Sequence, residues 1–171
     1  MRQRVRICLI CAMLFSSVAV FAQQGNAPAV TPQDSLVLTS DQTSVRFSPA
    51  EFHALPHVNI TVHNGHTGAS ETYSGVPLAA LLGKINAPLG KDLRGAAMTS
   101  YLIATGSDGY SVVLSLAEVD PDFRDGQVIV ADAKDGQSLA KNGPFQLIVS
   151  EDKRPARWVH NLRGITLQQA H

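Results

Sequence analysis

The sequence predicts an α+β fold, in which mixed or antiparallel sheets are accompanied by short helices. Two observations predict it: the apolar runs are short and numerous, as in strands, and the helix signals are few and brief. A third is the tetrapeptide of residues 106–109, Gly-Ser-Asp-Gly, which lies between two apolar runs and is typical of a hairpin. The length of 171 residues fits one domain.

The first residues indicate a secretory signal peptide over residues 1–22. Arg2, Arg4 and Arg6 form a basic region, residues 7–21 are apolar, and small residues precede Gln23. The arginines are not adjacent, so the signal resembles the general secretory type rather than the twin-arginine type. We therefore expect a periplasmic or secreted protein with no membrane contact after cleavage; the alternative is an uncleaved anchor, although the apolar run is shorter than the ~20 residues that span a bilayer.

Charge and cysteine content limit the function. The whole chain has 14 Lys+Arg and 14 Asp+Glu, a balance that argues against nucleic-acid binding. Removal of Arg2, Arg4 and Arg6 leaves 14 − 3 = 11 positive against 14 negative residues, a net charge of −3. Both cysteines, Cys8 and Cys11, leave with the signal peptide, so the mature chain has neither a disulfide nor a thiolate.

The first half of the mature chain begins with a lead over residues 23–35, rich in Pro, Gln and Ala, that we expect to be flexible. A strand follows at residues 36–39. Ser48 and Glu51 form a capping box with Pro at the first helical position, which predicts a short helix that ends before Pro56. Residues 57–63 alternate apolar and polar side chains, which indicates a half-buried strand.

In the second half, residues 64–70 are predicted as a loop, and Ser74-Gly75 as a tight bend before a helical turn over 77–82. A short helical segment is predicted over 115–119, and the carboxylates Asp120, Asp122 and Asp125 are interpreted as a solvated acidic loop. Further strands are predicted over residues 101–105, 110–114, 127–131, 145–149 and 159–167.

The segment after residue 132 resembles a known family. It has a turn at Asp135-Gly136, then Asn142-Gly143-Pro144, an apolar strand, and Arg157-Trp158 before the last strand. This order is similar to the DG…GGP…VKW pattern that closes the molybdopterin-binding domain of the sulfite oxidase family. Residues 73–82 (YSGVPLAALL) and 104–119 (ATGSDGYSVVLSLAEV) match two further family segments. The resemblance implies a sulfite-oxidase-like molybdopterin-binding domain over residues 36–168.

The same resemblance places the expected cofactor contacts. The family's molybdenum-binding cysteine lies in the loop that corresponds to residues 63–70, where this chain has His63, Asn64 and His66. Imidazole and amide groups do not replace a soft, anionic thiolate. Arg157 corresponds to a basic side chain that meets the cofactor phosphate, a role that suits a guanidinium. We therefore expect no conventional centre and no bound cofactor, although the resemblance implies molybdopterin.

Three functions stay open at this point. The first is a non-catalytic binding or accessory module that holds an anionic small molecule or a partner protein in the old cofactor cleft, near His63, Arg157 and Asp108. The second is an oxidoreductase that binds molybdopterin without a protein thiolate. The third is a copper or zinc binder that uses His63 and His66. His53 and His57 have helical spacing, but Pro56 between them is expected to break that geometry.

Asp108-Gly109-Tyr110 and Trp158 are interpreted as parts of the fold. Asp-Gly makes the predicted hairpin turn, and Tyr110 is expected to pack at the start of the next strand. For Trp158, burial in the core is as good an interpretation as contact with a cofactor.

Overall fold

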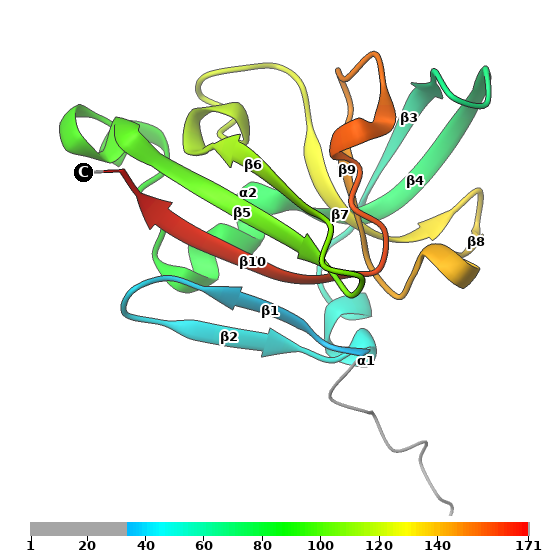
Figure 1. Ribbon diagram of the computed structural model, residues 1–171, viewed down its shortest axis with the longest axis horizontal. Coiled ribbons are helices and arrows are strands. Elements are labelled where there is room, and N and C mark those ends of the chain that lie inside the picture. Colours follow the sequence, from blue (N-terminus) through cyan, green and yellow to red (C-terminus); the bar gives the residue numbers. More distant parts are fainter. Residues whose placement is uncertain (1–33, 171) are drawn as a thin grey trace, which may run out of the picture.

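Two five-stranded sheets form the frame of the computed structural model, which describes residues 34–170 (Figure 1). The strands are β1 (Leu36–Thr39), β2 (Ser44–Phe47), β3 (Val58–Asn64), β4 (Ala69–Pro77), β5 (Ser100–Gly106), β6 (Ser111–Ser115), β7 (Val128–Lys134), β8 (Gln137–Ser138), β9 (Gln146–Val149) and β10 (Leu162–Gln169). The predicted signal peptide, and the predicted lead up to residue 33, lie outside the described residues.

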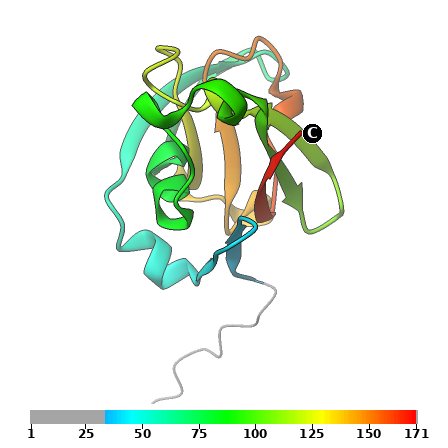
Figure 2. The same ribbon diagram turned by 90° about the vertical axis from the view of Figure 1, so that its left-hand side faces the viewer.

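The helices are short, as predicted. They are α1 (Pro49–His53), α2 (Leu78–Leu82) and the 3-10 turns η2 (Gly83–Ile85), η3 (Gly90–Asp92), η4 (Gly95–Thr99), η5 (Leu116–Glu118), η6 (Ala140–Asn142) and η7 (Pro155–Arg157). The turns between β4 and β5, drawn in green, gather on one side of the molecule (Figure 2). None of the helices in residues 34–170 has the length and apolar character needed to cross a membrane.

The sheets are mixed and antiparallel, which confirms the predicted fold class. The first sheet has the order β2-β1-β10-β5-β6, and its β1–β10 pair is parallel while the other pairs are antiparallel. The second has the order β3-β4-β7-β8, with β9 also paired to β7, and all its pairs are antiparallel. The hairpin predicted at residues 106–109 joins β5 and β6.

Aromatic side chains join α1 to the core. The capping box forms as predicted, since the Ser48 hydroxyl accepts from the backbone N–H of Glu51 and the Glu51 carboxylate accepts from the backbone N–H of Ser48. The helix then ends at His53, before Pro56. Its one buried residue, Phe52, has no exposed surface and packs edge-on against Phe145, with 4.8 Å between ring centroids. Burial of such a side chain stabilises the fold by about 1.5–3 kcal/mol.

Strand β3 has the predicted alternation, with Ile60 and Val62 buried and His63 exposed. The predicted bend at Ser74-Gly75 is wrong, because β4 continues through it with a register shift against β7. A Cβ atom on Gly75 would lie 2.2 Å from the carbonyl oxygen of Val130. Glycine here permits close approach of two strands rather than a turn. Strand β4 was therefore missed by the sequence interpretation.

Candidate functional site

The end of β3 and the turn that leads to β4 carry three of the predicted cofactor contacts. Asn64 builds this turn: its Oδ1 accepts from the backbone N–H groups of His66 (2.9 Å) and Thr67 (3.3 Å). The side chains of His63 and His66 are exposed. A Cβ atom on Gly65 would lie 2.5 Å from the carbonyl oxygen of Lys153, so the turn packs against the segment that precedes η7.

A buried carboxylate holds the base of this turn. Glu71 is 5% exposed and accepts from the Tyr73 hydroxyl (2.8 Å) and from Nδ2 of Asn64 (3.0 Å), and it pairs with Lys134 at 2.7 Å. Burial raises the pKa of Glu71, but the hydrogen bonds from Lys134, Asn64 and Tyr73 outweigh it and the net pKa is lowered. Burial and the hydrogen bond to Glu71 raise the pKa of Tyr73. The Asn64 side chain therefore belongs to a structural network.

Arg157, the fourth predicted contact, lies at the end of η7 between two carboxylates. Its Nε and Nη2 donate to the two oxygens of Asp152 (2.9 and 2.6 Å), and its Nη1 donates to Oε1 of Glu118 (2.7 Å). The hydrogen bonds with Asp152 raise the pKa of Arg157, against the opposing effect of burial. Binding of a phosphate by this guanidinium would therefore require it to leave one of these carboxylates.

A cavity of about 240 Å³, here called the Trp158 cleft, lies beside η7. It is lined by Asp108, Tyr110, Pro155, Ala156, Trp158 and His160. Tyr110 does not pack as predicted: it is 50% exposed, and its hydroxyl donates to the carbonyl oxygen of Ala156 at 2.5 Å. Tyr110 precedes β6, and its side chain reaches across the cleft to η7 rather than into the core.

Trp158 itself is 3% exposed, and its indole N–H donates to the carbonyl oxygen of Val149 at 3.0 Å. Its ring packs edge-on against Tyr73, with 5.8 Å between ring centroids. The predicted core role of Trp158 is thus confirmed, while one edge of the side chain also lines the cleft.

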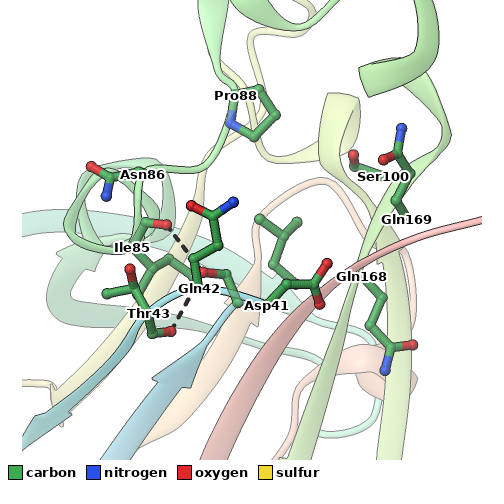
Figure 3. A pocket seen from close by; sticks show the side chains of 11 residues that line it. Asp41, Gln42, Thr43, Ile85, Asn86, Pro88, Ser100, Gln168 and Gln169 are labelled. Atoms are coloured by element: carbon green, nitrogen blue, oxygen red, sulfur yellow. Dashed lines mark hydrogen bonds between the residues drawn. The ribbon is translucent and has the colours of Figure 1, made fainter.

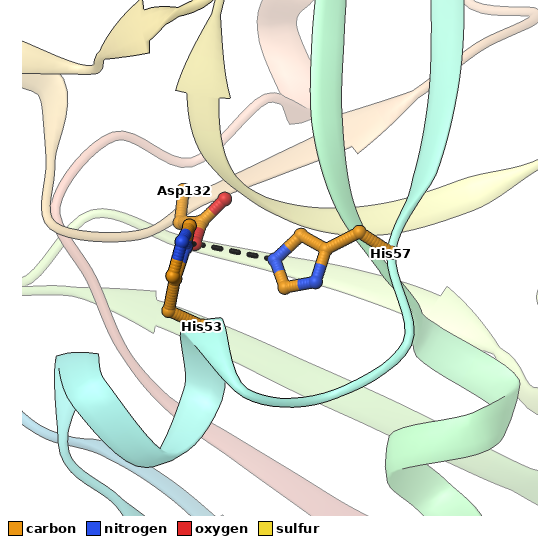
Figure 4. Close-up of side chains that lie close together, drawn as sticks. All are labelled: His53, His57 and Asp132. Carbon is orange, nitrogen blue, oxygen red and sulfur yellow. Dashed lines mark hydrogen bonds and ion pairs between the residues drawn. The ribbon is translucent and has the colours of Figure 1, made fainter.

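A second group of polar side chains comes from three separate places in the chain (Figure 4). His53 ends α1, His57 precedes β3, and Asp132 lies in β7. Oδ2 of Asp132 is 2.9 Å from Nδ1 of His53 and 3.2 Å from Nε2 of His57. The helix does end before Pro56, as predicted, so His57 lies outside α1. The chain turns back after α1, and the two imidazole ring centroids are nevertheless 5.6 Å apart.

Sequence interpretation missed Asp132 because nothing local links it to these histidines. His53 and Asp132 are 79 positions apart, and only the placement of β7 brings the carboxylate to the end of α1. His63 and His66 belong to no comparable group, since His53, His57 and Asp132 form the one cluster of three or more His, Cys, Asp or Glu ligand atoms within residues 34–170.

A cavity of about 640 Å³, here called the α1 groove, is lined in part by two members of this group. His53 and Asp132 contribute to its wall, and the rest is mostly apolar: Pro49, Ala50, Ser138, Leu139, Ala140, Gly143, Pro144 and Phe145. His53 and Asp132 are therefore the titratable residues of the α1 groove.

Another cavity, of about 210 Å³, lies at the β1–β2 turn and is lined mainly by hydroxyl and amide side chains (Figure 3). The hydroxyl of Ser40 donates to the carbonyl oxygens of Thr43 (3.4 Å) and Ile85 (3.3 Å) there. Asp41 is its single carboxylate, and its lining contains no His or Lys that could activate one of the hydroxyl groups for catalysis.

Comparisons with known proteins support the fold. No family model and no curated protein matches the sequence. Among solved structures, the fold is similar to the crystal structure of the sulfane dehydrogenase SoxCD from Paracoccus pantotrophus, with a TM-score of 0.61 and 17% sequence identity over 82% of this chain. The match spans 39% of that chain. The likeness confirms the predicted α+β, sulfite-oxidase-like fold, and at this identity it concerns the fold alone.

The residues present do not fit molybdopterin in its usual form. Both cysteines precede residue 34, so the β3–β4 turn has no thiolate to offer the metal. Arg157, the predicted phosphate contact, is already paired with Asp152 and Glu118. The residues of this chain therefore do not support molybdenum-based oxidation or reduction.

Proposed function

We propose that this protein is an exported, non-catalytic binding module that uses the Trp158 cleft of a former cofactor fold. The observation that carries the proposal is the pairing of Arg157 with Asp152 and Glu118 in a chain without a mature thiol. The fold is kept, but the two side chains that would hold the cofactor's metal and phosphate are missing or occupied. The Trp158 cleft is present beside η7, which carries Arg157.

Two exposed cations that precede the cleft wall in the chain favour a small anion as the ligand, against the single carboxylate of that wall, Asp108. Lys153 and Arg154 precede η7, are exposed, and have no ion-pair partner among residues 34–170. Desolvation lowers the pKa of His160 in the cleft wall, against a weaker opposing effect of Asp108, so this imidazole is neutral near pH 7 and adds hydrogen-bonding capacity without charge. Tyr110 and Val113, which are 50% and 58% exposed, favour a partner protein as the alternative ligand.

Trp158 provides the measurement, because it is the single tryptophan of the chain and lines the cleft. We expect phosphate, sulfate or small carboxylates to change its fluorescence in a saturable way in the wild type. The double variant Lys153→Gln/Arg154→Gln should weaken this effect, whereas Lys91→Gln, at another exposed cation, should leave it unchanged. Saturation equal in all three proteins would argue against the proposed site.

Metal and pterin analysis of protein purified from its own source tests the alternative. About one molybdenum per chain would contradict the proposal and favour the molybdopterin-dependent oxidoreductase. A protein without molybdenum whose cleft responds to an anion agrees with it.

A further inference from the structure

We propose that His53, His57 and Asp132 form a binding site for a divalent late transition metal, with Zn²⁺ as the reference ion. This site is independent of the proposed function. His57 precedes β3 whereas Asn64 ends it, and the six residue steps from Val58 to Asn64 span about 20 Å. The β3–β4 turn and the metal site thus lie at opposite ends of one strand.

The first argument is the hydrogen bond of His57. Its Nδ1 lies 2.6 Å from the carbonyl oxygen of Leu55. A carbonyl oxygen only accepts hydrogen bonds, so Nδ1 carries a proton and Nε2 is the ring nitrogen left to bind a metal through its lone pair. That lone pair faces the Asp132 carboxylate. In metal sites a histidine is fixed in this way, with one nitrogen donating to a backbone carbonyl and the other bound to the metal.

The second argument is the lack of hydrogen bonds at the same atoms. Nε2 of His57 and Oδ1 of Asp132 are both buried, and neither has a hydrogen-bond partner within residues 34–170. The 3.2 Å contact between Nε2 of His57 and Oδ2 of Asp132 has the distance of an ion pair but not the geometry of a hydrogen bond. Buried polar atoms without partners are costly, and a metal ion bound by Nε2 of His57 and by the Asp132 carboxylate would give Nε2 the partner that it lacks.

The third argument is distance. Bonds of about 2.0–2.2 Å from Zn²⁺ to nitrogen and oxygen place two ligand atoms about 2.9 Å apart at a right angle and about 3.4 Å apart at the tetrahedral angle. The nitrogen–oxygen separations here are 2.9 and 3.2 Å, within that range. The three ligand atoms all lie within 4.8 Å of one another, and the His53 side chain, 79% exposed, has room to rotate toward the ion.

The ligand set decides the metal class. Two imidazole nitrogens and one carboxylate oxygen suit Zn²⁺, Cu²⁺, Ni²⁺ or Co²⁺, whereas Ca²⁺ and Mg²⁺ prefer oxygen ligands alone and Cu⁺ prefers sulfur. Three protein ligands leave at least one coordination position open. His53 and Asp132 line the α1 groove, so that position is reached from the groove. Its apolar wall fits a small molecule with one donor group, such as a carboxylate, and an apolar body.

Titration of the metal-free mature chain with Zn²⁺, followed by calorimetry, tests the site. We expect one equivalent to bind to the wild type. His57→Ala, His53→Ala and Asp132→Asn should each weaken binding by about 100-fold or more, beyond what loss of an outer-shell partner costs. His63→Ala/His66→Ala is the matched control, and its binding should equal that of the wild type.

His53→Ala keeps the test decisive if His57→Ala fails to fold, because the exposed His53 side chain contributes little to packing. Co²⁺ gives a second readout, since its visible spectrum should depend on His53 and not on His63. The proposal is overturned if the wild type does not bind Zn²⁺, or if His53→Ala and Asp132→Asn leave the Zn²⁺ affinity unchanged. It is also overturned if the His63→Ala/His66→Ala control no longer binds one equivalent of Zn²⁺.

Discussion

Arg157 and Glu118 connect the ends of the two sheets. Nη1 of Arg157 donates to Oε1 of Glu118 at 2.7 Å, although the residues are 39 positions apart. Glu118 ends η5, which follows β6 of one sheet, and Arg157 ends η7, which follows β9 of the other. Burial raises the pKa of Glu118, but the hydrogen bonds from Arg157 and from the backbone N–H of Ser115 lower it overall.

A structural role for Arg157 predicts a stability effect. Arg157→Ala should lower the free energy of unfolding by about 1–3 kcal/mol, toward the lower value because the pair is partly solvated. Urea unfolding followed by Trp158 fluorescence measures it. Arg157→Ala made in a Glu118→Gln background should cost less than in the wild type; equal costs would show that the two side chains are not coupled.

The Glu71 network predicts pH-dependent stability. The folded-state pKa of Glu71 lies below its ordinary value of 4.5, so the unfolded chain takes up the proton first as the pH falls. Its contribution is present in full above that ordinary value and is lost as the pH falls through the folded-state pKa.

We therefore expect Glu71→Gln to lower the free energy of unfolding at pH 7 by about 1–3 kcal/mol, because Lys134 loses a buried ionic partner. The difference from the wild type should shrink in acid, where the wild-type carboxyl is protonated as well. Urea titrations at a series of pH values measure it. Parallel stability curves for the two proteins would exclude Glu71 as the source of the acid dependence.

Local patterns predicted much of the fold because they report on neighbouring residues. The capping box of Ser48 and Glu51 and the alternation of β3 depend on side chains within a few positions, and both are confirmed. Strand β4 was not predicted, because the need for glycine at position 75 comes from a long-range contact. The backbone of Val130 in β7 approaches Gly75 too closely for a side chain to fit. Glycine in a sequence alone is equally typical of a bend.

Two glycines provide a matched test of that explanation. Gly75→Ala should destabilise the fold by about 1–3 kcal/mol, since its new methyl group would meet the backbone of Val130 at 2.2 Å and push β4 from β7. Gly83 has a helical φ of −58° and open space around it, so Gly83→Ala should be neutral or stabilising by up to about 1 kcal/mol. Thermal unfolding measures both; similar effects of the two substitutions would refute the steric argument.

The candidate sites were harder to predict than the fold, for the same reason. The resemblance located Arg157, but its partners Glu118 and Asp152 come from a distant turn and a loop, and they change what the guanidinium is free to do. The spacing of His53 and His57 can be read from the sequence, whereas Asp132 reaches these histidines only because the sheet places β7 beside them. The sequence therefore shows which residues have side chains suited to a metal, but it does not show which of those side chains lie close together in the fold.

The acidic segment after β6 gives a last prediction. It was expected to be a solvated loop, yet Asp120 is 1% exposed, and its two oxygens accept from the backbone N–H groups of Gly90 (2.6 Å) and Asp122 (2.9 Å). Asp120→Ala would leave both donors without this partner and should lower the free energy of unfolding by about 1–3 kcal/mol. Asp122→Ala, at an exposed side chain of the same loop, should cost far less. Chemical denaturation of both variants measures the difference, and equal losses would mean that Asp120 does not anchor the Gly90 turn.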